Sequence, residues 1–195
     1  VRLQEKNLKT VVEPYRTYMS KKIEVTKINP PIIANNIFLD LKIHDIPQTV
    51  KKTIKTLSTL KPAILNVHAL GGRKMMEYAM ESISENSPKT QLVGVTVLTS
   101  LDDKDLQTMG INIPSKDLVV ELAKLTKISG LAGVVCSSKE IKIVREACGA
   151  DFKIIVPGIR PEGSDKNDQK RIMTPKEAVN PVSYTHLRAH ETNSH

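Results

Sequence analysis

The chain has 195 residues, of which 39% are hydrophobic, and its formal net charge is +8. This length suits a single soluble domain. The chain contains no apolar run of roughly 18 residues, so the sequence predicts no membrane-spanning helix. The positive charge does not favour nucleic acid, because the lysines lie among acidic residues and aromatic side chains for base stacking make up only 3% of the chain. We therefore expect a cytoplasmic protein with neither membrane nor nucleic-acid partners, in which Cys136 and Cys148 are reduced thiols.

Short apolar runs rich in β-branched residues alternate along the chain with longer segments of helical period. The predicted strands cover residues 37–42, 64–68, 92–98, 133–136 and 154–156. They are almost continuously apolar, as expected for parallel strands that are covered on both faces. Two of the predicted helices begin near Pro47 and Ser115. The pattern indicates a parallel α/β fold and leaves two architectures open, a doubly wound sheet and a closed barrel.

Charged residues stand at the end of the first predicted strand, just before a helix that begins with proline. Asp40 and Lys42 are two positions apart, so a strand would project them from the same face, close enough to interact. Asp45 follows in the strand-to-helix loop. Charges at this place suggest a functional role, and a purely structural ion pair is the alternative interpretation.

The stretch FLDLKIHDIPQTV at 38–50, with its D-x-K-x-x-D spacing, resembles the signature of the orotidine 5'-phosphate decarboxylase family. Four further segments agree in order and spacing: NVHA at 66–69 before a glycine pair, VTVLTS at 95–100, GVVCS at 133–137, and PGIRP at 157–161 with Asp-Gln at 168–169. Related sugar-phosphate enzymes share D-x-K-x-x-D, but the PGIRP loop narrows the choice. The resemblance implies a (β/α)8 TIM barrel, incomplete at both ends, with its active site at the carboxyl ends of the strands.

The reaction that the resemblance implies is the decarboxylation of orotidine 5'-phosphate to uridine 5'-phosphate in pyrimidine biosynthesis, with no metal and no organic cofactor. It makes Asp40, Lys42 and Asp45 the catalytic array and Lys42 the proton donor. A fixed ammonium beside the reacting carbon stabilises the negative charge that develops there. By the same resemblance, Asp45 reaches across the interface of a homodimer, so that each active site needs two chains.

Substrate contacts are also implied by the resemblance, and they fall to Ile46, Pro47, Thr49, Thr99, Arg160 and Gln169. The polar, glycine-containing loop 161–168 suits a lid over the substrate phosphate, with a plain surface linker as the alternative. We expect structural hydrogen-bonding roles for His44 and His68, since Lys42 already supplies the proton. Gly71-Gly72 is expected to start a helix, and the neighbouring methionines are expected in the core.

Both ends of the chain depart from the family pattern. We expect a poorly matching segment at 1–36, a partial barrel domain at 37–181, and a non-native tail at 182–195 that reads like a translated sequencing adapter. Three histidines in this tail have no scaffold that would make them a metal site. Three features of the family cannot be placed in the sequence: the Asp of the first strand, the Lys of the second strand and the Gly-Arg pair of the eighth strand.

Two alternative functions remain open at this point. The first is a magnesium-dependent sugar-phosphate decarboxylase or aldolase of the same suprafamily. The second is a catalytically inactive truncated fragment, because a barrel without its first and last strands exposes sheet edges and an open core.

Overall fold

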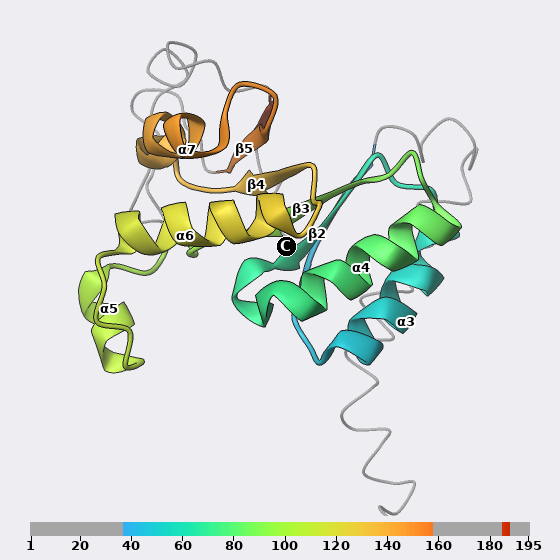
Figure 1. The fold of residues 1–195 in the computed structure, drawn as a ribbon, viewed down its shortest axis with the longest axis horizontal. Coiled ribbons are helices and arrows are strands. Elements are labelled where there is room, and N and C mark those ends of the chain that lie inside the picture. Colours follow the sequence, from blue (N-terminus) through green and yellow to red (C-terminus); the bar gives the residue numbers. More distant parts are fainter. Residues whose placement is uncertain (1–36, 158–184, 188–195) are drawn as a thin grey trace, which may run out of the picture. The chain divides into compact units, whose positions relative to one another are not determined.

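The structure is a computed structural model that describes residues 37–157 and 185–187. Strands alternate with helices throughout the described part (Figure 1). In chain order the elements are β1 Phe38–Ile43, α3 Pro47–Ser58, β2 Ile64–His68, the 3-10 turn η2 Ala69–Gly71, α4 Gly72–Asn86, β3 Gln91–Val95, α5 Asp103–Thr108, α6 Ser115–Ile128, β4 Gly133–Val135, the 3-10 turn η3 Ser138–Glu140, α7 Ile141–Cys148, β5 Lys153–Pro157 and β6 Thr185–Leu187. The predicted starts of helices near Pro47, Gly72 and Ser115 are confirmed.

The strands form one parallel sheet in the consecutive order β1-β2-β3-β4-β5-β6. A doubly wound sheet reverses its strand order at a switch point, whereas a (β/α)8 barrel adds each strand beside the preceding one. The observed order has no reversal, so it excludes the doubly wound alternative. All carboxyl ends of the strands consequently lie at one edge of the sheet.

Strand β3 ends at Val95, three residues before the predicted end of the strand at 92–98. Just beyond this end, the backbone N and the side-chain Oγ1 of Thr96 both donate to the carbonyl O of Val135, at 3.1 and 2.9 Å. The last paired residues of β3 and β4 are Val95 and Val135. Residues 97–100 therefore form a bend and turn rather than the continuation of a strand.

Strand β6 falls within the predicted tail at 182–195. Its residues Thr185–Leu187 pair in parallel with Ile155–Pro157 of β5. The physical reason lies in the backbone: the edge of β5 offers N–H and C=O groups whose pairing depends little on side chains. The other residues of the tail, and the whole segment 1–36, lie outside the described residues.

The two faces of the sheet bury different sets of side chains. The outer face packs against the helices through fully buried residues that include Leu65, Val134 and Ile154. Helix α4 adds Met75 and Met76, both fully buried, which confirms their predicted place in the core. Helices α3 and α4 pack side by side, as do α6 and α7 (Figure 1).

The inner face of the sheet carries an apolar cluster from alternate positions of neighbouring strands. Val93, Val95, Val135 and Ile155 are buried there, and Phe38, Ile64 and Leu98 pack against them. Full burial of one such side chain contributes about 1.5–3 kcal/mol. The cluster therefore runs along the inner face of the sheet beside the carboxyl ends of the strands, where Asp40 and Lys42 lie.

A polar contact closes the amino-terminal side of this cluster. Lys153 Nζ on β5 donates to Gln91 Oε1 on β3 at 2.7 Å, across the intervening strand β4. Gly133 of β4 makes this crossing possible, because a Cβ at that position would collide with the backbone and Cβ of Lys153. The glycine is therefore required by close packing and not by its φ angle.

Candidate active site

The carboxyl end of β1 is irregular where the first two charged residues lie. The pairing of β1 with β2 steps from Leu39↔Leu65 to Ile43↔Val67, so four residues of β1 run beside two of β2. Within this bulge Lys42 has a φ of +51°, in the left-handed region that costs a side-chain-bearing residue about 1–2 kcal/mol. At Lys42 the backbone of β1 therefore departs from the geometry of a regular strand.

Asp40 and Lys42 form the ion pair that their spacing predicts. Lys42 Nζ lies 2.7 Å from Asp40 Oδ1, and the two side chains are 41% and 46% exposed. An ion pair of this exposure contributes only about 0–1 kcal/mol to stability. Its stabilising value is thus no larger than the cost of the strained backbone that presents Lys42.

Asn66 of β2 joins the charged pair from the neighbouring strand. Its Nδ2 donates to Asp40 Oδ1 at 2.6 Å, and its Oδ1 accepts from the backbone N–H of Lys42 at 2.7 Å. The residue is completely buried. Sequence reasoning did not single out Asn66, although a lone amide inside the apolar strand ILNVH is a visible signal, because a buried polar group needs partners.

Two histidines lie beside this group. The rings of His44 and His68 have centroids 5.4 Å apart and are tilted by 32°. Burial lowers the pKa of His68 below its usual 6.5, and the neighbouring His44 and Lys42 lower it further. His68 Nδ1 is buried without a hydrogen-bond partner among the described residues, so the expected structural hydrogen bond is absent at that atom.

Asp45 and its neighbours form the rim of an open concavity after β1. Asp45 is exposed, and its Oδ1 accepts a hydrogen bond from the backbone N–H of Ile46 at 2.6 Å. Ile46 is 68% exposed, and Pro47 is the first residue of α3. The concavity has a volume of about 520 Å³ and is lined by His44, Asp45, Ile46, Pro47, Leu70 and Gly71.

Of the remaining predicted substrate-contact residues, the structure describes Thr49 and Thr99. Thr49 is exposed in the first turn of α3, and Thr99 is half-buried in the turn after β3. Arg160, Gln169 and the predicted lid loop lie outside the described residues. The structure therefore brings Asp40 and Lys42 into direct contact, and places Asp45, Ile46 and Pro47 together at the adjoining rim.

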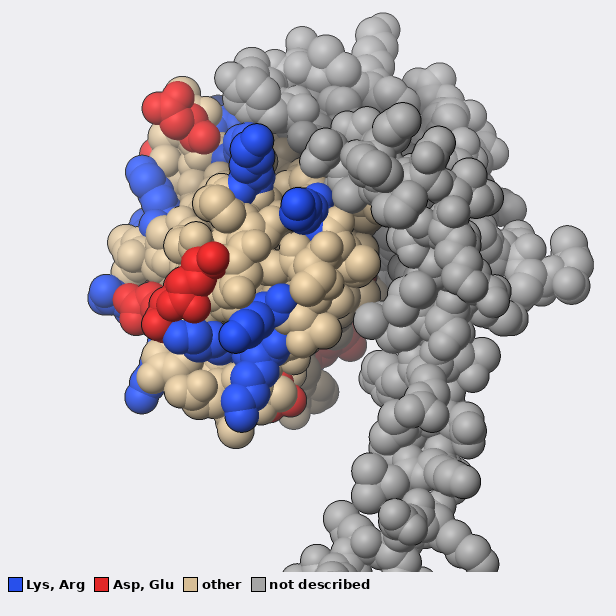
Figure 2. Space-filling model, turned by 90° about the vertical axis from the view of Figure 1, so that its right-hand side faces the viewer, with Lys and Arg blue, Asp and Glu red and all other residues tan. Residues whose placement is uncertain are grey.

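No three His, Cys, Asp or Glu side chains within residues 37–157 form a group suited to a metal ion. None of the described helices combines the length and the apolar character needed to cross a bilayer. On the face shown in Figure 2, basic and acidic side chains are interspersed among uncharged ones.

The consecutive parallel strands, with a charged pair at their carboxyl ends, define the class of (β/α)8 barrels, and a comparison with solved structures agrees. An orotidine 5'-phosphate decarboxylase from Lactobacillus acidophilus matches with a TM-score of 0.69 and 38% identity, over 78% of this chain and 66% of that one. An uncharacterized conserved protein from Geobacillus kaustophilus matches with a TM-score of 0.67 and 35% identity, over 83% of this chain and 73% of that one. The predicted α/β barrel fold class is confirmed.

The chain belongs to the orotidine 5'-phosphate decarboxylase / HUMPS family, which matches residues 24–185. Two relatives named orotidine 5'-phosphate decarboxylase, from Glaesserella parasuis and Psychromonas ingrahamii, are 48% and 52% identical over 147 residues. Each alignment covers 74% of this chain. The chain spans 63% and 62% of the lengths of these two relatives.

Proposed function

We propose that this protein decarboxylates orotidine 5'-phosphate to uridine 5'-phosphate, in the cytoplasm, as part of pyrimidine biosynthesis. The observation that supports the proposal most directly is the 2.7 Å contact between Lys42 Nζ and Asp40 Oδ1 at the carboxyl end of β1, in a chain of this family. Active sites of (β/α)8 barrels lie at that end of the strands. Two relatives that are about half identical to this chain carry the name of this activity.

The chemistry assigns different tasks to the two charged side chains. When the C6–carboxyl bond breaks, its electron pair stays on C6 and CO2 leaves. The Lys42 ammonium stabilises that negative charge and then transfers a proton from Nζ to C6, leaving a neutral amine that regains a proton from water. Asp40 faces the departing carboxylate, and two such charges about 4 Å apart repel by about 4 kcal/mol at an effective dielectric of about 20.

Repulsion by Asp40 is too small to account for the whole rate acceleration, since enzymes lower barriers by about 8–23 kcal/mol. Most of the effect must come from Lys42 and from binding energy at the remote ribose and phosphate groups. We assign those contacts to Ile46, Pro47, Thr49, Thr99, Arg160 and Gln169. The half-buried Thr99 would meet the pyrimidine edge.

Asp45 is proposed to act across a homodimer interface. Its carboxylate is exposed at the rim of the concavity, beside the 68% exposed side chain of Ile46. A carboxylate so placed is available to a second chain. The dimer would then supply each active site with the Asp45 of its neighbour.

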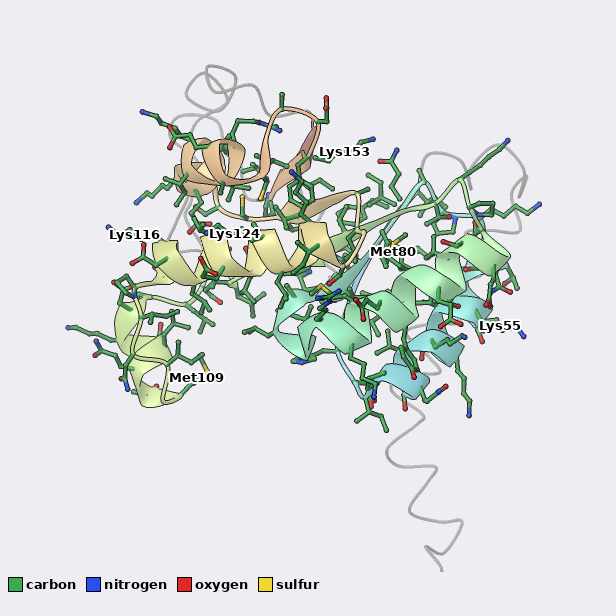
Figure 3. The ribbon with its side chains drawn as sticks, in the orientation of Figure 1. Lys55, Met80, Met109, Lys116, Lys124 and Lys153 are labelled. Carbon is green, nitrogen blue, oxygen red and sulfur yellow. The ribbon has the colours of Figure 1, made fainter. Side chains whose placement is uncertain are left out.

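The decisive experiment compares two lysine substitutions in the full chain. Lys42→Ala removes the proposed proton donor, and we expect the release of CO2 from orotidine 5'-phosphate to fall by at least about 10⁴-fold. Lys55→Ala removes an exposed lysine that projects outward from α3 (Figure 3), and we expect an unchanged rate. Near-normal turnover by Lys42→Ala would show that Lys42 is not the proton donor.

The same assay separates the two alternatives. Turnover of a sugar phosphate that stops in EDTA would favour the magnesium-dependent relative, whereas the proposed reaction continues in EDTA. A folded wild-type chain that neither binds nor converts orotidine 5'-phosphate would favour the inactive fragment.

A further inference from the structure

Asn66 uses both ends of its side-chain amide on the charged group at the end of β1. Its carbonyl Oδ1 accepts from the N–H of Lys42, and its Nδ2 donates to the same Asp40 oxygen that receives Lys42 Nζ. These two contacts fix the orientation of the amide, because a flipped side chain would face an N–H with an NH2 group and a carboxylate with an oxygen. Asn66 thus connects the backbone of Lys42 to the carboxylate of Asp40.

The bulge in β1 explains one of these contacts in structural terms. Because four residues of β1 run beside two of β2, the ladder cannot satisfy every backbone group of the bulge. Asn66 Oδ1 takes the place of a ladder acceptor for the N–H of Lys42. An acceptor atom alone would be sufficient for that structural task.

The second contact is not required by the bulge. Asp40 is 46% exposed in its side chain, so water could solvate its carboxylate at little cost. Asn66 instead donates to Asp40 from a completely buried position, where an amide is expensive unless its partners are fixed. The bond holds Oδ1 of Asp40 at a defined place, and Lys42 Nζ is held by that oxygen.

We propose that Asn66 is a positioning residue for decarboxylation, one that keeps the Asp40 carboxylate and the Lys42 ammonium in a fixed relation while the proton leaves Nζ. This inference rests on the proposed function. Once Lys42 is neutral, its attraction to Asp40 weakens, and the Nδ2 donor of Asn66 retains the carboxylate in place for the next cycle. Preorganisation of this kind acts on kcat more than on KM.

Three variants of the full chain test the proposal. Asn66→Leu removes both contacts. Asn66→Asp retains an acceptor for the N–H of Lys42 but turns a second carboxylate toward Asp40. Thr90→Val is the matched control, since Thr90 is also buried, donates to the carbonyl O of Pro62 at 2.6 Å, and lies at the opposite end of the sheet.

We expect Asn66→Leu to lower kcat by about 10²-fold with a much smaller change in KM, and Thr90→Val to leave both unchanged. Asn66→Asp should also lose kcat near neutral pH and recover part of it as pH falls, because a proton taken up by the carboxylate pair restores a donor toward Asp40. If Asn66 only satisfied the bulge, Asn66→Asp would retain the wild-type kcat and pH profile. That result would overturn the proposal.

Amide hydrogen exchange at Lys42 provides a measurement that does not depend on activity. We expect the Lys42 N–H to be protected in the wild type, Asn66→Asp and Thr90→Val, and unprotected in Asn66→Leu. An Asn66→Leu chain that retains this protection would overturn the proposal. A wild type without decarboxylase activity, combined with the expected exchange pattern, would refute the proposed function and leave the role of Asn66 in holding Lys42 supported. If Asn66→Leu does not fold, Asn66→Asp still decides by its pH profile.

Discussion

The site combines residues whose presence the sequence shows with contacts that only the fold creates. The pairing of Asp40 with Lys42 follows from their spacing and was predicted. The contacts of Asn66 were not, because they join positions 24 and 26 residues apart and depend on β1 lying beside β2 in one register. A polar residue in an apolar strand indicates that hydrogen-bond partners exist, but it does not identify them.

His68 is the residue for which the structure predicts a pH dependence of stability. Its pKa is lowered in the folded state by burial, by His44 and by Lys42. The unfolded chain therefore binds a proton more readily than the folded one, so the contribution of His68 to stability is full above about pH 6.5 and declines as pH falls below it.

We expect urea unfolding of the wild type to show a lower free energy of unfolding at pH 5 than at pH 8, and His68→Gln to reduce that difference. The pKa of His68 itself, measured by an NMR titration of its ring protons, should lie below 6.5. A value at or above 6.5 would contradict the lowering of the His68 pKa by its half-buried position and its neighbours.

The backbone geometry of strand β1 was only partly predictable from its residues. The alternation of a regular strand predicts that Asp40 and Lys42 share a face, and they do interact. The bulge and the positive φ of Lys42 cannot be predicted from the sequence. A lysine does not indicate a bulge, and this bulge depends on how β1 pairs with β2. Likewise, β3 was predicted too long because the strand ends where its pairing with β4 stops, which the apolar run in the sequence does not reveal.

The strain at Lys42 can be measured by comparing two substitutions that both remove the ammonium. Lys42→Gly should be more stable than Lys42→Ala by about 1 kcal/mol, because glycine adopts a positive φ without steric cost. Urea unfolding measures the difference. Neither variant should decarboxylate the substrate.

A control for this comparison exists outside the site. Lys61, in the loop after α3, has a φ of +46° and is exposed. Lys61→Gly should likewise be more stable than Lys61→Ala, while both retain turnover. If the glycine variant were the less stable one at Lys42 but not at Lys61, the backbone at the end of β1 would not be strained in the manner described.

At the scale of the whole molecule, the strand and helix pattern predicted the α/β class, but only the sheet order separated the barrel from the doubly wound sheet. That order depends on which strands are neighbours in space, a property that local periodicity does not contain. The resemblance to the family had already predicted the barrel. The pairing of β6 was missed because backbone hydrogen bonding at a sheet edge needs no sequence signature.

The proposed dimer gives a prediction for the assembly. Ile46→Lys places a charge on the 68% exposed side chain beside Asp45, and we expect it to shift the protein toward monomers in analytical ultracentrifugation, with lower activity per chain on dilution. Ile128→Lys is the matched control, because Ile128 is 60% exposed near the end of α6 and should leave association unchanged. A wild type that is monomeric at all concentrations yet active would contradict the proposed role of Asp45 across an interface.

The contact between Lys153 and Gln91 gives the sheet a second polar end, opposite to the one that carries the chemistry. The apolar side chains of Val93, Val135 and Ile155 pack on the face of the sheet between these two groups of polar residues. A substitution at one end therefore leaves the hydrogen bonds at the other end in place. Selection for heat tolerance can therefore act on the amino ends of the strands, at Gln91, Gly133 and Lys153, without changing any residue of the candidate site.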